Sequence, residues 1–94
     1  DMLCTAYSDK ETNGSGREEP LVFTVDYGNA RIFHTMLGHA GATTEDNIAM
    51  QCTGFQVLLL RGAEWAATGK VTQKVPKDFP TETTCSYRKD YKEN

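Results

Sequence analysis

The sequence predicts an α/β protein in which a small set of strands precedes one long helix. Three features predict it: a short apolar segment at residues 2–7, an alternating pair of segments at 21–37, and apolar residues at helical spacing from about 47 to 68. One helix covers only one face of a sheet. We therefore expect the C-terminal part of a larger α/β domain, the alternatives being a chain that folds alone or one that a partner chain completes.

The first predicted element is a buried strand at residues 2–7, which are mostly apolar and are followed by Ser8 and Asp9. Strands of this near-continuous apolar kind usually need cover on both faces. Residues 8–19 contain no large apolar side chain and have Asn-Gly-Ser-Gly at their centre, which predicts a solvated loop. Loops of this length in compact domains are often functional. Its charged end, Arg17 to Glu19, is interpreted either as solvated charge or as the rim of a substrate site.

An antiparallel hairpin is predicted at residues 21–37. Apolar and polar side chains alternate along residues 21–27, which is the period of a strand with one more apolar face. Gly28 and Asn29 supply the turn, because both residues adopt positive φ at low cost. The return strand ends at a run of small residues, 38–42, where the backbone turns sharply.

One amphipathic helix is predicted at about residues 47–68. Thr43 and Thr44 are N-cap candidates, and the acids after them suit the positive end of a helix. Apolar positions then recur at steps of three or four: Ile48, Cys52, Phe55, Leu59, Gly62 and Ala66. The helix is expected to end at Gly69 with a left-handed cap. Gly54 and Gly62 inside it cost about 1 kcal/mol each relative to Ala, which is tolerable if another backbone comes close at those points.

The periodic pattern stops after Gly69. Residues 70–94 contain Pro76, Pro80 and scattered aromatic and charged side chains. The sequence is therefore divided into residues 1–69, the part of the α/β domain, and residues 70–94, an extended tail that lies over a surface.

Composition excludes several classes of function. The chain has 94 residues with 10 basic and 13 acidic side chains and a net charge of −3, so it lacks the basic surface of a nucleic-acid-binding module. Its longest apolar run, residues 57–60, is far shorter than the roughly 20 residues of a membrane span. Cys4, Cys52 and Cys85 have no metal-ligand spacing, and no glycine-rich phosphate loop occurs. We expect three ordinary thiols and no metal site, and the sequence names no cofactor.

The candidate catalytic residue is His39. It lies just past the end of a predicted strand, where ligands bind in open α/β sheets, and its neighbours are small. We predict His39 as a general acid/base or metal-assisting residue, with Gly38 and Gly41 as substrate-binding residues that leave room for a ligand.

A histidine that acts as a base needs a carboxylate or another acceptor to orient it. Asp26, Glu45 and Asp46 are the candidates that the sequence offers. The second histidine, His34, lies in the middle of a predicted strand and is expected to have a structural role. Cys52 is expected in the core.

Residues 20–39 resemble the closing hairpin of the trehalose-utilisation, or ThuA-like, proteins. That pattern is a proline, an apolar strand, Tyr-Gly-x-Gly-Arg, a second strand and Leu-Gly-His, matched here by Pro20, residues 27–31 and residues 37–39. Residues 55–67 look like the helix that follows in the family. Ala30 departs from the pattern, since the family usually has glycine there. The resemblance covers about residues 2–80.

The resemblance implies a flavodoxin-like, class I glutamine amidotransferase-like fold, with a largely parallel sheet and an antiparallel excursion near its end. It also implies a domain more than twice as long as this chain, action on trehalose or a related sugar derivative, and a pocket near His39. The alternative is a non-catalytic carbohydrate-binding or structural module. The expected partners are a small sugar ligand and either the remainder of the same domain or a second copy of the chain.

Overall fold

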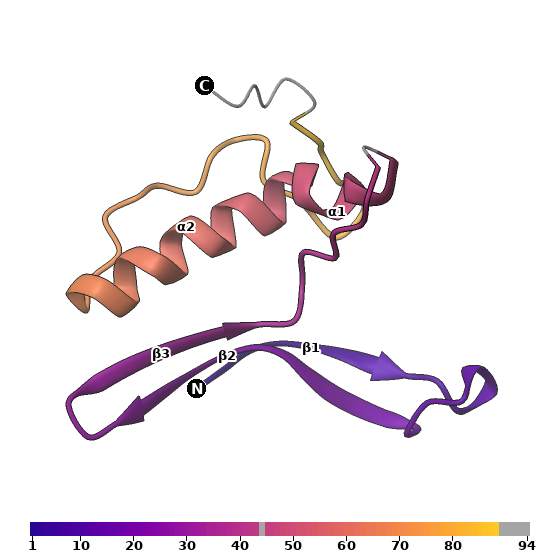
Figure 1. Cartoon of the computed structure of the whole chain (residues 1–94), viewed down its shortest axis with the longest axis horizontal. Coiled ribbons are helices and arrows are strands. Elements are labelled where there is room, and N and C mark those ends of the chain that lie inside the picture. Colours follow the sequence, from indigo (N-terminus) through magenta and orange to yellow (C-terminus); the bar gives the residue numbers. More distant parts are fainter. Residues whose placement is uncertain (44, 89–94) are drawn as a thin grey trace. The chain divides into compact units, whose positions relative to one another are not determined.

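The computed structural model describes residues 1–43 and 45–88, which form two compact units, the first from Asp1 to Met36 and the second beginning at Leu37 (Figure 1). The strands and helices follow in the order β1 (Met2–Ser8), β2 (Arg17–Tyr27), β3 (Ala30–Thr35), α1 (Ile48–Gln51) and α2 (Thr53–Thr68). Short 3-10 turns occur at Lys10–Thr12 and Glu45–Asn47. The predicted α/β class, with strands before helices, is confirmed.

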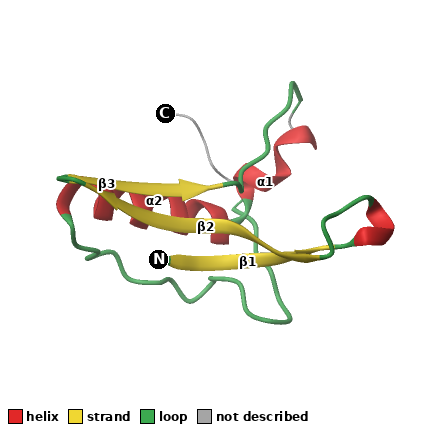
Figure 2. Cartoon of the chain, turned by 90° about the horizontal axis from the view of Figure 1, so that it is seen from below, coloured by secondary structure: helices red, strands yellow, loops and turns green. Residues whose placement is uncertain are grey.

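The first unit is an antiparallel sheet with β2 between β1 and β3 (Figure 2). Strands β2 and β3 pair without a register shift, so that Phe23 lies opposite His34 and Tyr27 opposite Ala30. Gly28, with a φ of 58°, starts the turn between them. The hairpin was therefore predicted correctly, although Gly28 has the positive φ and Asn29 does not, and β3 ends at Thr35 and not at residue 37.

The connection between β1 and β2 is shorter than the predicted loop at residues 8–19. Ser8 still belongs to β1 and pairs with Arg17, the first residue of β2. Between them, the Asp9 carboxylate accepts a hydrogen bond from the backbone N–H of Glu11 at 2.9 Å and caps a 3-10 turn. The loop prediction was wrong for residues 17–19, because an exposed strand pair needs only backbone hydrogen bonds and tolerates polar side chains on both faces.

The sheet exposes much of its apolar surface. Val22, on the central strand, is fully buried, whereas Met2, Val25 and Ile32 are exposed. Within the described residues, β1 and β3 each pair on one side only. Such unpaired edges and uncovered apolar side chains are expected of a partial domain.

The predicted single helix is in fact two helices, because the backbone at Cys52 is extended (φ −61°, ψ 124°). The extended residue pairs with Tyr87, in an antiparallel bridge to the segment after α2. The bridge is flanked by two backbone hydrogen bonds, from Thr53 to Ser86 at 3.0 Å and from Arg88 to Gln51 at 2.8 Å. Apolar periodicity continues through Cys52, so the break has no local signal.

The packed face of α2 agrees only in part with the predicted stripe. Phe55 and Gly62 are buried as expected, but Leu59 and Ile48 are exposed, and Val57 is buried instead. A Cβ added to Gly54 would lie 3.0 Å from a ring carbon of Pro80. The close neighbour at this glycine is therefore a proline side chain and not another backbone. Helix α2 ends as predicted, with Gly69 in the left-handed conformation at a φ of 77°.

The segment after α2 runs back along that helix in extended form, as far as residue 88 (Figure 1). Asp78 and Arg88 tie its far part together, through an ion pair of 3.2 Å between Oδ1 and Nη2. Residues 89–94 of the predicted tail, and the N-cap candidate Thr44, lie outside the described residues. In the part of the chain that is described, no helix has the length and apolar character that a membrane span requires.

Glu64 ties the end of α2 to the residues that follow it. Its Oε1 accepts hydrogen bonds from the backbone N–H and, at 2.7 Å, the hydroxyl of Thr72, and its Oε2 accepts one from Gln73 Nε2 at 2.7 Å. The guanidinium of Arg61 donates to the carbonyl of Gln73. The bonds to the carboxylate, those from Thr72 first, lower the pKa of Glu64 to about 2.

We expect the stability contributed by Glu64 to disappear at acid pH. Because the pKa of Glu64 is lowered on folding, this contribution is fully present above the ordinary value of 4.5 and is lost as the pH falls toward about 2. Glu64→Gln should therefore flatten the decrease of Tm between those pH values, as measured by circular dichroism. Glu82→Gln, at an exposed position of the same unit, is the control and should keep the wild-type profile. Identical profiles for wild type and Glu64→Gln would contradict this role.

Candidate functional site

The candidate site is the loop between β3 and the helices, which carries Gly38, His39 and Gly41. This loop belongs to the second compact unit. The His39 side chain is exposed. It is therefore not buried by the part of the chain that the structure describes.

Gly38 holds the loop on one side of His39. Its φ is 100°, a conformation that side-chain-bearing residues rarely adopt. A Cβ at this position would also collide with the ring of Phe55, a buried residue of α2. Both the backbone conformation and the space beside the Phe55 ring therefore require glycine at this position.

Gly41 holds the loop on the other side. Its backbone N–H donates to Asn47 Oδ1 at 2.8 Å. A Cβ would come within 2.9 Å of the Asp46 Cγ atom and closer still to its Cβ. These contacts give Gly38 and Gly41 a packing role, and their binding of a substrate stays a prediction.

Thr43 and Asp46 cap the helical turn after the loop. The backbone N–H and the hydroxyl of Thr43 donate to Asp46 Oδ2 at 3.2 and 2.9 Å, and the Asp46 N–H donates back to the Thr43 hydroxyl at 3.3 Å. This reciprocal arrangement is a capping box in which aspartate replaces the usual glutamate. The Asp46 carboxylate therefore serves the structure of the loop.

Asp26 and Glu45 are the other two carboxylates predicted as candidates for orienting His39. Asp26 lies on β2 opposite Arg31, within the first unit, and Glu45 is exposed beside Asp46. Within residues 1–43 and 45–88, no three His, Cys, Asp or Glu side chains form a group that could hold a metal ion.

His34 has the structural contact that was expected of it. Its ring stacks on Phe23 across the β2–β3 pair, with centroids 4.5 Å apart and planes inclined by 22°. Cross-strand aromatic pairs of this kind stabilise a sheet.

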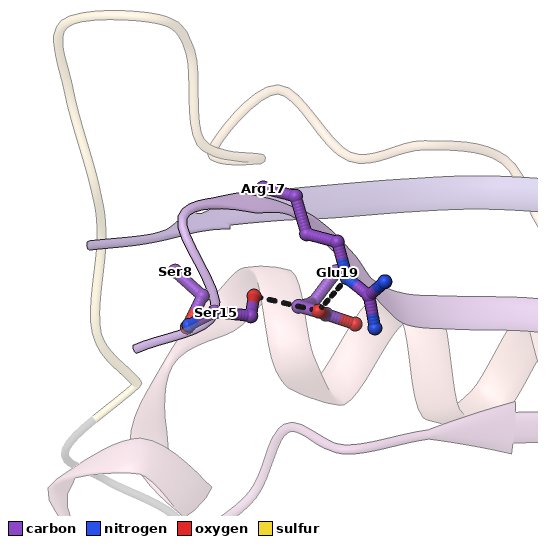
Figure 3. Close-up of polar contacts among 4 residues, drawn as sticks. All are labelled: Ser8, Ser15, Arg17 and Glu19. Atoms are coloured by element: carbon purple, nitrogen blue, oxygen red, sulfur yellow. Dashed lines mark hydrogen bonds and ion pairs between the residues drawn. The ribbon is translucent and has the colours of Figure 1, made fainter. Parts of the chain in front are cut away.

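A polar cluster marks the start of β2 (Figure 3). Glu19 Oε1 accepts hydrogen bonds from Arg17 Nε at 2.6 Å and from the Ser15 hydroxyl at 2.7 Å, and the backbone N–H of Ser15 donates to Ser8 Oγ at 3.1 Å. The hydrogen bond from Arg17, followed by that from Ser15, lowers the pKa of Glu19. The cluster stabilises the β1–β2 connection. That these residues also form the rim of a substrate site stays a prediction.

Sequence reasoning missed a group of two thiols and a phenol. Cys52, expected in the core, is half-buried and pairs with Tyr87. Cys85 Sγ donates to the Tyr87 hydroxyl at 3.8 Å, and this bond is the main reason why the pKa of Tyr87 is raised. No local pattern joins these residues, because the two cysteines are far apart in sequence.

The contact between Gly38 and Phe55 predicts a specific sensitivity to substitution. Gly38→Ala should lower the free energy of unfolding by about 1–3 kcal/mol through backbone strain and by about 1–3 kcal/mol more through overpacking against the ring. Gly28→Ala is the matched control, since Gly28 also has positive φ but has no atom within 4 Å of an added Cβ. Urea unfolding measures both variants. An equal loss of unfolding free energy in the two variants would contradict the prediction, because it would mean that the Phe55 ring moves aside without destabilising the fold.

Neither a protein-family model nor a curated protein matches the chain. A solved structure matches it over its full length, with 98% identity and a TM-score of 0.89: a ThuA-like protein from Parabacteroides merdae ATCC 43184. The chain covers 34% of that protein. The description of the solved protein gives a family resemblance and no activity. The chain therefore belongs with the ThuA-like proteins, as a sequence equivalent to about a third of a longer member.

Proposed function

We propose that this chain supplies the His39 loop to a sugar-processing site of a ThuA-like protein. The observation that carries the proposal is an exposed imidazole on a loop that is held on both sides, by the Phe55 ring at Gly38 and by the Asn47 amide at Gly41. A general acid/base must be accessible to its substrate and must also be held in position. The loop meets both requirements.

The proposed role of His39 is proton transfer at a hydroxyl or glycosidic oxygen of trehalose or a related sugar derivative. Histidine suits this role because its neutral and protonated forms are both accessible near neutral pH. In the neutral form, His39 takes a proton from a sugar hydroxyl, and in the protonated form it returns one to a departing oxygen. Sugar as the substrate class rests on the resemblance of residues 20–39 and 55–67 to the trehalose-utilisation family.

The group that orients His39 in this proposal is not Asp46, whose carboxylate is engaged by Thr43. We assign the role to Glu45 or to the part of the longer protein that this chain does not cover. Gly41 has its N–H occupied by Asn47, so its proposed contribution to substrate binding is its carbonyl and the space beside it. Gly38 contributes space only.

A non-catalytic carbohydrate-binding module is the second candidate function. The observation that favours it is the engagement of Asp46, because the carboxylate that lies near the loop is used for structure and does not pair with His39. A binding module of this kind would show ligand-dependent melting without turnover.

The proposal is tested by substituting His39 in the longer ThuA-like protein that carries this segment. His39→Gln and His39→Ala should reduce turnover by about 100- to 10,000-fold, the usual range for a general acid/base, and should leave Tm unchanged because the side chain is exposed. The substrates are trehalose, other disaccharides and their oxidised forms. His34→Gln is the control, which should keep turnover while losing the Phe23 stack.

Two outcomes would contradict a catalytic His39. The first is turnover that is unchanged in both His39 variants. The second is a wild-type protein that is stabilised by a sugar of the panel but converts none of them, which supports the binding module instead.

A further inference from the structure

The segment after α2 brings a second cysteine to the break between α1 and α2. The backbone hydrogen bonds of the Cys52–Tyr87 bridge join the residues on either side of this pair, and they do not join Cys52 to Tyr87 directly. In an antiparallel pair this is the close type of position, with Cα atoms about 4.5 Å apart and side chains on the same face. The side chains of Cys52 and Tyr87 are therefore neighbours.

Cys85 lies on that same face. It precedes Tyr87 by two residues on an extended segment, and side chains two residues apart in such a segment point the same way. Its Sγ donates to the Tyr87 hydroxyl at 3.8 Å. Both cysteines are among the groups that raise the pKa of Tyr87, Cys85 being the larger cause. Two free thiols thus face one phenol from two different segments.

The segment that carries Cys85 is held in place by its own contacts. Arg88 forms two hydrogen bonds with the Asp78 carboxylate, at 3.2 and 3.3 Å, and the Ser86 hydroxyl donates to the Asp78 carbonyl. These contacts, with the backbone bonds to the helix break, keep Cys85 close to Cys52 and raise the effective concentration of one thiol at the other.

We propose that Cys52 and Cys85 are a redox pair that closes to an intrachain disulfide with a small-molecule disulfide, such as oxidised glutathione, as oxidant. Diagonal neighbours on an antiparallel pair lie roughly 7–8 Å apart at Cα, and a disulfide needs about 4.4–6.8 Å. Closure therefore requires a shift of about 1 Å by the exposed segment. The product would join the segment covalently to the α1–α2 junction.

The reaction is two successive thiol–disulfide exchanges. The thiolate of Cys85, the more exposed of the two, attacks one sulfur of the oxidant, forming a mixed disulfide and releasing one glutathione thiolate. The Cys52 thiolate then attacks the Cys85 sulfur and releases the second glutathione. The two protein thiols lose two protons and two electrons in total, and the oxidant is reduced to two thiols.

The test is peptide mapping of the protein that carries this chain, after incubation with oxidised glutathione. Mass spectrometry without reductant should find the Cys52 and Cys85 peptides joined, two hydrogen atoms lighter than their sum, and separate again after dithiothreitol. Cys4→Ser is the matched control, because Cys4 is a free, exposed cysteine of the sheet, and this variant should still form the link. Cys52→Ser should instead accumulate a glutathione adduct on Cys85, since the second exchange is blocked.

The proposal is overturned if wild-type protein gives only glutathione adducts, or if Cys85 is joined to Cys4 or to another chain in preference to Cys52. The wild-type map decides the question even if a serine variant unfolds. The outcome is also independent of turnover, so it does not depend on the proposed function of His39.

Discussion

The contact between Gly38 and the Phe55 ring is the constraint on which the candidate site depends. The ring occupies the volume that a side chain at position 38 would fill, and the backbone there has a φ of 100°. Phe55 is itself buried in α2, so the loop at Gly38 lies against a packed residue of the helix. His39, the next residue, is exposed.

Backbone pairing with a distant segment determines the shape of the helical unit. An uninterrupted helix through Cys52 would satisfy the apolar periodicity, yet the chain breaks there and pairs with Tyr87. Two backbone hydrogen bonds to Ser86 and Arg88 accompany the break. The same pairing gathers the two thiols around the phenol, so the helix break and the proposed redox pair have one physical cause.

The sheet unit belongs to a chain that spans about a third of a longer solved protein. A strand order of β1-β2-β3 leaves both outer strands with one unpaired edge among the described residues, and apolar side chains such as Ile32 and Met36 are exposed. The solved ThuA-like relative is about three times as long. The site proposed around His39 is accordingly a shared one, to which the rest of such a protein contributes substrate contacts.

The sequence by itself determined the features that depend on short-range chemistry. Alternating side chains with Gly28 and Asn29 between them specify the hairpin, Gly69 specifies the helix end, and the small residues around His39 indicate an exposed turn. Only the tertiary structure decided where the helix breaks and which distant side chains contact each other. Thr43 and Asp46 are only three residues apart, a spacing at which a capping box can be recognised from the sequence, whereas the meeting of Cys52 with Tyr87 depends on a backbone pairing across a long stretch of chain. Local patterns do not encode such contacts, because their energies come from groups that lie far apart until the chain has folded.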